Sequence, residues 1–118
     1  MMSQIRQQWL HGFLDLCLLC LLEDRRDYGL GLMERLSASG FDEVPGGTLY
    51  PALLRLEKQG LVRVEWEASV SGPRRKYYEL TSEGRGAAGE RARSWAEFRT
   101  AIESIVGEVG ASTETQTL

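Results

Sequence analysis

The chain has 118 residues, of which 42% are apolar and 26% are charged, and this is the composition of one ordinary soluble globular domain. Its net charge of −3 excludes a uniformly basic nucleic-acid binder. Residues 48–76, however, carry six cations against three anions, and the rest of the chain has a net charge of −6. A basic patch on an acidic body is typical of DNA-binding proteins of modest net charge, although such patches also occur on proteins without a nucleic-acid role.

The first predicted element is a helix over residues 3–23 that is apolar on most of its sides. Trp9 and Phe13 precede an unbroken apolar run over residues 16–22. The segment is too short to span a bilayer, is interrupted by Asp15, and lacks the small-residue cleavage site of a signal peptide. We therefore expect no membrane association, a cytoplasmic location, and a helix buried against more than one partner, one of which is a second subunit.

Two cysteines, Cys17 and Cys20, lie three residues apart within this helix. Redox-active pairs usually occupy a helix N-terminus, whereas these two lie among leucines in mid-helix, where burial raises a thiol pKa. His11 is the only histidine and there is no second cysteine pair, so no zinc site can be completed. The pattern favours two reduced core thiols and no metal, with a thiol sensor as the alternative.

Residues 24–40 predict a loop and a second helix, with Asp27 as its N-cap and Gly40 as its C-terminal stop. Gly29 and Gly31 lower the helix propensity of this segment and indicate close packing against a neighbour. Residues 41–47 predict a turn.

A third helix is predicted to begin near Gly47 or Thr48, which places Pro51 in its first turn, and to end at Gly60. An inward stripe of leucines recurs at helical spacing: Leu49, Leu53 and Leu56. The other face presents a hydroxyl, a proline ring and two cations: Thr48, Pro51, Arg55 and Lys58. Helix, turn and two-faced helix form a helix-turn-helix, whose last helix suits a DNA major groove. A solvated amphipathic helix is the alternative interpretation.

Residues 61–67 alternate as a half-buried strand, with Val62, Val64 and Trp66 on the buried side. Residues 68–73 predict a hairpin loop, and residues 75–81 predict the return strand, with Tyr78 and Leu80 buried. The cationic wing tip consists of Arg74, Arg75 and Lys76. Such a tip suits a phosphate backbone or a minor groove, and a solvated charged turn is the alternative.

The last predicted helix begins after Thr81 as N-cap and runs to residue 109. Its large apolar residues are spaced alternately three and four positions apart, which is a heptad pattern: Trp95, Phe98, Ile102, Ile105 and Val109. Such a stripe requires another helix, either within the monomer or across a two-fold axis against Trp9, Phe13 and Leu16 of the first helix. The predicted division is a winged helix-turn-helix domain (1–81), a dimerisation helix (82–109) and a disordered tail (110–118).

Two stretches, GGTLYPALLRLEKQGLV and GPRRKYYELTSEG, closely resemble the PadR family of bacterial transcription regulators, and DYGLGLMERL matches its second helix. The resemblance covers about residues 9–95. It implies a mainly α fold with a small two-stranded β wing and a dimeric repressor that releases DNA in response to a small molecule or another signal. Several residues match DNA-contacting positions of the family: Tyr28, Thr48, Tyr50, Pro51, Gly72, Arg74, Arg75 and Lys76. Leu30 and Gly31 replace the Tyr-Glu pair that the family often carries.

The resemblance also implies a ligand site, because a tryptophan of the last helix pairs across the two-fold axis in short PadR proteins and flat aromatic compounds stack between the pair. Trp95 matches that position. Leu16 and Cys20 match the lining of the same cavity, and Phe98 and Arg99 follow one turn later. A planar aromatic effector is therefore one interpretation of Trp95, and simple packing of the dimer is the other.

Together these features predict a homodimeric repressor that binds an inverted repeat in double-stranded DNA and needs no cofactor. A winged-helix adaptor that binds protein and never contacts DNA is the competing class. An enzyme is disfavoured, because one histidine in the first helix leaves no nucleophile, base and orienting group that the spacings bring together.

Overall fold

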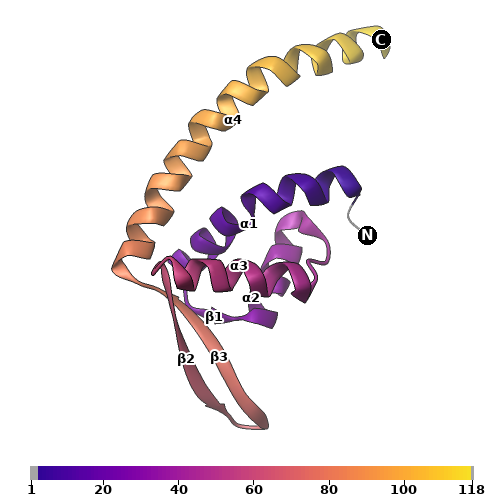
Figure 1. The fold of residues 1–118 in the computed structure, drawn as a ribbon. Coiled ribbons are helices and arrows are strands. Elements are labelled where there is room, and N and C mark those ends of the chain that lie inside the picture. Colours follow the sequence, from indigo (N-terminus) through magenta and orange to yellow (C-terminus); the bar gives the residue numbers. More distant parts are fainter. Residues whose placement is uncertain (1–2, 118) are drawn as a thin grey trace.

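The computed structural model describes the backbone of residues 3–117 and the side chains of residues 3–109 (Figure 1). The chain is mainly helical with one small antiparallel sheet. Its elements, in chain order, are α1 (Gln4–Asp24), β1 (Asp27–Tyr28), α2 (Gly29–Leu36), a π-helical turn (Ser37–Phe41), α3 (Gly46–Lys58), β2 (Val62–Ser69), β3 (Gly72–Leu80) and α4 (Ser82–Thr117).

The helix α1 supplies the centre of the hydrophobic core. Ser3 caps it by accepting a hydrogen bond from the Arg6 amide at 3.3 Å, and Leu14, Leu18 and Leu19 are fully buried. The predicted helix over residues 3–23 is confirmed. The helices α2 and α3 cover one side of α1, and the beginning of α4 rises along another (Figure 1).

The start of α2 differs from the prediction. Tyr28 is the N-cap and Asp27 belongs to β1, a two-residue strand that pairs with β3 and makes the sheet three-stranded in the order β1-β3-β2. The buried Asp27 carboxylate accepts hydrogen bonds from the Tyr28 amide at 2.8 Å and from Arg35 at 3.3 Å. A strand this short leaves no alternating pattern, and the carboxylate that suggested an N-cap instead ties β1 to α2.

The glycines of α2 permit close packing, as predicted. A Cβ at Gly29 would overlap the Tyr50 phenol, and a Cβ at Gly31 would overlap the Asp27 carboxylate. Gly40 has a φ of 107° and ends this helical segment, because only glycine adopts that conformation without strain.

The helix α3 begins at Gly46, directly after Pro45, one residue earlier than the earlier of the two predicted starts. Pro51 therefore lies in the second turn and not in the first, so the Gly47 carbonyl receives no hydrogen bond from residue 51. The inward stripe is confirmed: Leu49, Leu53 and Leu56 have no exposed surface.

The β2–β3 hairpin projects away from the helices (Figure 1) and is longer than predicted. Its strands continue to Ser69 and from Gly72, so the predicted loop over residues 68–73 shrinks to a tight turn next to a bulge at Glu67–Ser69. Tyr78 and Leu80 are buried, as predicted. Trp66, predicted on the buried side, is 53% exposed.

The helix α4 starts after Thr81, whose hydroxyl accepts a hydrogen bond from the Gly84 amide at 3.0 Å, which confirms the predicted N-cap. The backbone remains helical to Thr117, unlike the tail predicted to be disordered from Gly110; once formed, a helix gains one hydrogen bond for each residue added. Over the described residues, no helix is both long and apolar enough to cross a membrane.

Two glycines at the start of α4 give a matched test of the packing at this junction. A Cβ at Gly84 would overlap the backbone carbonyl of Leu61, whereas a Cβ at Gly86 meets nothing. We expect Gly84→Ala to lower the free energy of unfolding by about 1–3 kcal/mol through this overlap. Gly86→Ala should raise it by about 0.5–1 kcal/mol through helix propensity. Urea denaturation measures both, and equal effects would contradict the packing described.

Candidate nucleic-acid interface and apolar cavity

The solvent-facing side of α3 is formed by Gly47, Pro51, Leu54 and Lys58. This surface is nearly flat at its N-terminal end and carries one cation at its C-terminal end. Tyr50 lies on the flank next to the hairpin, and Thr48 is half-buried near the start of the helix. Small or flat side chains on an exposed helix face allow the helix to approach another surface closely.

Arg55, the other predicted cation of α3, is exposed beside this surface and is turned toward α1. Its guanidinium donates to both carboxylate oxygens of Asp15 on α1, at 2.9 and 3.3 Å, and this carboxylate raises the arginine pKa through its hydrogen bond and its charge. In the sequence, Asp15 is recognisable only as the charged residue that interrupts an apolar segment. Its partner could not be found without the packing of α1 on α3.

A hollow of about 370 Å³ lies between α3 and the hairpin. It is lined by Tyr50, Pro51, Leu54, Glu57, Lys76 and Tyr78. Burial raises the pKa of the Tyr78 phenol, and the neighbouring Tyr50 and Glu57 add to the effect. The hollow shows that the Lys76 side of β3 faces α3.

The three consecutive wing cations separate onto two faces of the hairpin. Arg74 and Lys76 lie near the Trp66 ring, 5.6 and 6.0 Å from its centroid. Arg75 points to the other face, where its guanidinium lies 4.6 Å from the ring centroid of Tyr28. Successive strand residues point to opposite faces, so the three predicted wing cations do not share one face of the hairpin.

Tyr28 was predicted near DNA through the family resemblance. Its half-buried ring packs edge-on against Tyr77, with centroids 5.5 Å apart, and Arg75 covers it. Gly72, another predicted contact, is exposed at the start of β3, where a Cβ would meet nothing. The structure thus gives Tyr28 an internal packing role and leaves Gly72 accessible.

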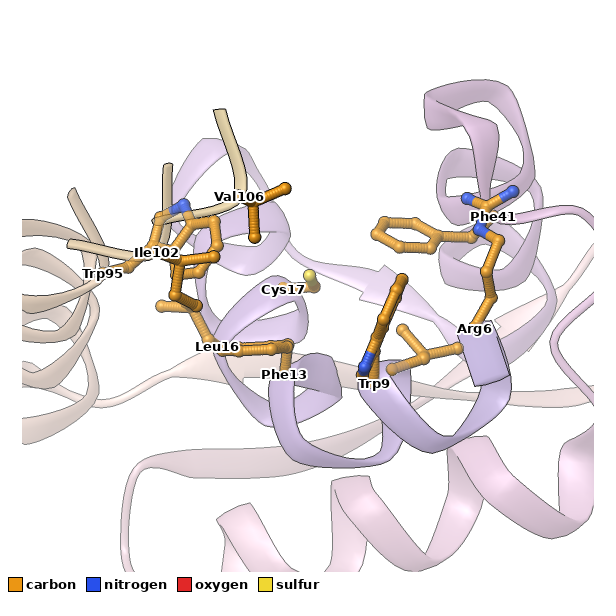
Figure 2. A pocket seen from close by; sticks show the side chains of 10 residues that line it. Arg6, Trp9, Phe13, Leu16, Cys17, Phe41, Trp95, Ile102 and Val106 are labelled. Atoms are coloured by element: carbon orange, nitrogen blue, oxygen red, sulfur yellow. The ribbon is translucent and has the colours of Figure 1, made fainter. Parts of the chain in front are cut away.

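An apolar cavity of about 610 Å³ lies between α1 and α4 (Figure 2). Trp95, Ile102 and Val106 of α4 line one side, and Phe41 and Trp9 line the other. The remaining lining residues are Arg6, Leu10, Phe13, Leu16 and Cys17. Trp95 packs edge-on against Phe13, with ring centroids 5.0 Å apart.

The predicted effector residues match this cavity in part. Leu16 and Trp95 line it, but Cys17 takes the place predicted for Cys20, which is exposed on another side of α1. Phe98 lies in an adjoining hollow beside Trp95, and Arg99 pairs instead with Glu103 at 3.3 Å. Helical spacing alone did not establish which of two cysteines one turn apart faces α4.

The predicted dimer residues of α4 are largely uncovered in the single chain. Ile105 is 71% exposed, Val109 66% and Phe98 51%, and Trp9 of α1 is 60% exposed. Large apolar side chains gathered along one stripe are typical of a protein–protein contact surface.

The three-stranded sheet, its projecting hairpin and the exposed face of α3 define the chain as a winged-helix protein. Residues 18–90 match the model of the transcriptional regulator PadR-like family. The chain belongs to this family, and it is accordingly a DNA-binding transcriptional regulator and not an enzyme.

Several relatives agree with this assignment. Transcriptional regulator Rv3488 of Mycobacterium tuberculosis is 40% identical over 86 residues, which cover 73% of this chain and 72% of the relative. A PadR-like regulator structure from Bacillus cereus is 35% identical with a TM-score of 0.75, covering 84% of this chain and 96% of its own. A PadR family regulator structure from Eggerthella lenta is 31% identical with a TM-score of 0.76, and the match covers 88% of this chain and 90% of the other.

The two free thiols allow the redox interpretation to be tested. Burial raises the pKa of both Cys17 and Cys20, and for Cys20 the charge of Glu23 adds to the effect. Because only the thiolate is a nucleophile, we expect slow alkylation by iodoacetamide at about pH 7 and a rate that is still rising above the ordinary thiol pKa. The exposed Cys20 should react before Cys17.

Mass spectrometry of Cys17→Ser and Cys20→Ser assigns the two rates. Rapid alkylation at neutral pH, or a disulfide formed within minutes under dilute peroxide, would instead favour a thiol-sensing regulator.

Proposed function

We propose that the chain is a homodimeric repressor that binds an inverted repeat in its operator and is released by a planar aromatic effector. The observation that carries the dimer is the uncovered apolar stripe of α4, continued by Trp9 of α1. A two-fold axis that packs α4 and α1 against a second copy would cover both at once.

In the proposed dimer, each α3 enters a major groove with its exposed N-terminal part first. The contacts come from Thr48, Tyr50, Pro51 and Lys58, together with the wing. Arg55 is left out because Asp15 holds it. Two-fold symmetry then requires an inverted repeat whose half-sites are about 34 Å apart, or one turn of duplex DNA.

The proposed effector site is the cavity between α1 and α4, which is large, apolar and partly aromatic. Stacking on Trp95 would contribute about 0.5–1.5 kcal/mol beyond the burial of apolar surface. A ligand there would change the angle between α4 and the winged domain, and with it the spacing of the two α3 helices. Leu16 lines the cavity and its neighbour Asp15 holds Arg55 of α3, so the site and the recognition helix share one segment of α1.

DNA binding and dimerisation are tested together with Ile105→Glu, which places a charge in the apolar stripe. We expect wild type to sediment as a dimer and to shift its own upstream DNA with a steep salt dependence, in keeping with several phosphate contacts. Ile105→Glu should sediment as a monomer and lose the specific shift. Ser104→Glu is the matched control, because its charge lies off the apolar stripe of α4, and it should behave as wild type.

A dimeric Ile105→Glu would contradict the proposed contact surface. A wild-type dimer that shifts no DNA even at low salt would favour a protein-binding adaptor.

The effector site is tested by tryptophan fluorescence with acridine as the first planar aromatic probe. We expect saturable quenching in wild type, because the ring would lie against Trp95, and a loss of most of the quenching in Trp95→Ala. The probe should also weaken the gel shift of wild type. Equal quenching in both proteins would place the probe elsewhere and refute this site.

A further inference from the structure

The two faces of the β2–β3 hairpin differ in charge. On the face away from α3, three arginines meet three glutamates: Arg26, Arg63 and Arg75 with Glu65, Glu67 and Glu79. Arg63 bonds to Glu79 across the strands, Arg26 bonds to Glu65 and Glu67, and Arg75 stands opposite Glu67 in the strand register. This face carries as many cations as carboxylates: Arg26 and Arg63 form ion pairs, whereas Arg75 covers the Tyr28 ring.

The opposite face of the hairpin carries cations without carboxylates of its own. It begins in the core with Val62, Leu80 and Tyr78 and continues outward to Trp66, Lys76 and Arg74. Glu57 of α3 is the carboxylate that lines the same hollow as Lys76. Toward the tip, Arg74 and Lys76 have no ion pair among the described residues.

Trp66 lies between these two cations. Lys76 stands directly opposite it in the strand register, and the Arg74 guanidinium lies over its ring. The indole is 53% exposed although the core is a few residues away on the same face. A ring in contact with a cation is attracted to it through its quadrupole, and the contact restricts the rotamers of the longer side chain. Trp66 therefore contacts both cations on the side that α3 occupies, and the Lys76 ammonium also lies 5.5 Å from the Tyr78 ring centroid.

We propose that this face is the DNA-contacting surface of the wing, with Arg74 and Lys76 bound to phosphates and Trp66 as the residue that positions them. Arg75, the residue between the two cations, has no part in it and instead fastens the hairpin to β1 by covering Tyr28. The inference rests on the DNA-binding function and assigns the contacts residue by residue. Trp66, which no sequence motif indicated as a DNA contact, belongs to the proposed surface. Arg75, which the motif included, does not.

The experiment compares neighbouring cations by fluorescence anisotropy on a labelled duplex of the upstream region, between about 50 and 200 mM NaCl. Removal of one phosphate-binding cation makes the negative slope of log K against log salt shallower by about 0.9. Arg74→Ala and Lys76→Ala should each show this shallower slope, whereas Arg75→Ala should keep the wild-type slope. A shallower slope for Arg75→Ala, or an unchanged slope for both of the others, would overturn the assignment.

The positioning role of Trp66 needs a readout that a merely structural role would not move. Trp66→Leu keeps an apolar side chain and both cations, so its melting temperature and salt slope should stay near wild type while affinity falls about three- to tenfold. The loss caused by Arg74→Ala should shrink in the Trp66→Leu background, because the two residues act together. Trp66→Phe, which retains a ring, should recover part of the affinity.

Additive effects of Trp66→Leu and Arg74→Ala would refute the positioning role and leave the phosphate contacts standing. If wild type binds no duplex DNA at any salt concentration, the DNA-binding function fails, and this inference fails with it. The two failures are therefore distinguishable.

Discussion

The rest of the structure depends on the need to cover α1, a helix that is apolar on nearly every side. Burial of apolar surface is the main favourable contribution to folding, and one small domain cannot enclose such a helix completely. The helices α2 and α3 bury Leu14 and Leu18 on one side. The beginning of α4 covers Phe13 on another, while Trp9 and much of the α4 stripe remain in contact with solvent. The same helix thus joins the surface proposed for DNA to the surface proposed for the second subunit.

Close backbone approach then fixes where α3 lies. Tyr50 of α3 fits over Gly29 because no Cβ stands there, and Gly31 makes room for the Asp27 carboxylate that ties β1 to α2 through Arg35. On the other side of α3, Asp15 holds Arg55. These contacts use the flanks of α3, through Tyr50 and Arg55. They leave its outer face exposed, with a flat N-terminal end and one cation, Lys58.

The alternation of a β-strand has a direct functional consequence in the wing. Three consecutive cations cannot all point to one side, so the hairpin has one balanced face, fastened to the body through Arg26 and Tyr28, and one face with unpaired cations beside Trp66. Charge that is left unpaired within the protein is available to a phosphate backbone. The exposed indole is part of this second face and lies in contact with its cations.

The sequence by itself determined the order of the main helices and the hairpin, the inward leucines of α3, the N-cap Thr81 and the family, because these depend on neighbours in the chain. It did not determine the strand β1, which is too short for a pattern, or the start of α3 at Gly46. Only the tertiary structure decided that Arg55 pairs with Asp15, that Cys17 and not Cys20 meets the cavity, and that Arg75 covers Tyr28. Each of these depends on which side chain from a distant element arrives at that place, and local spacing carries no record of it.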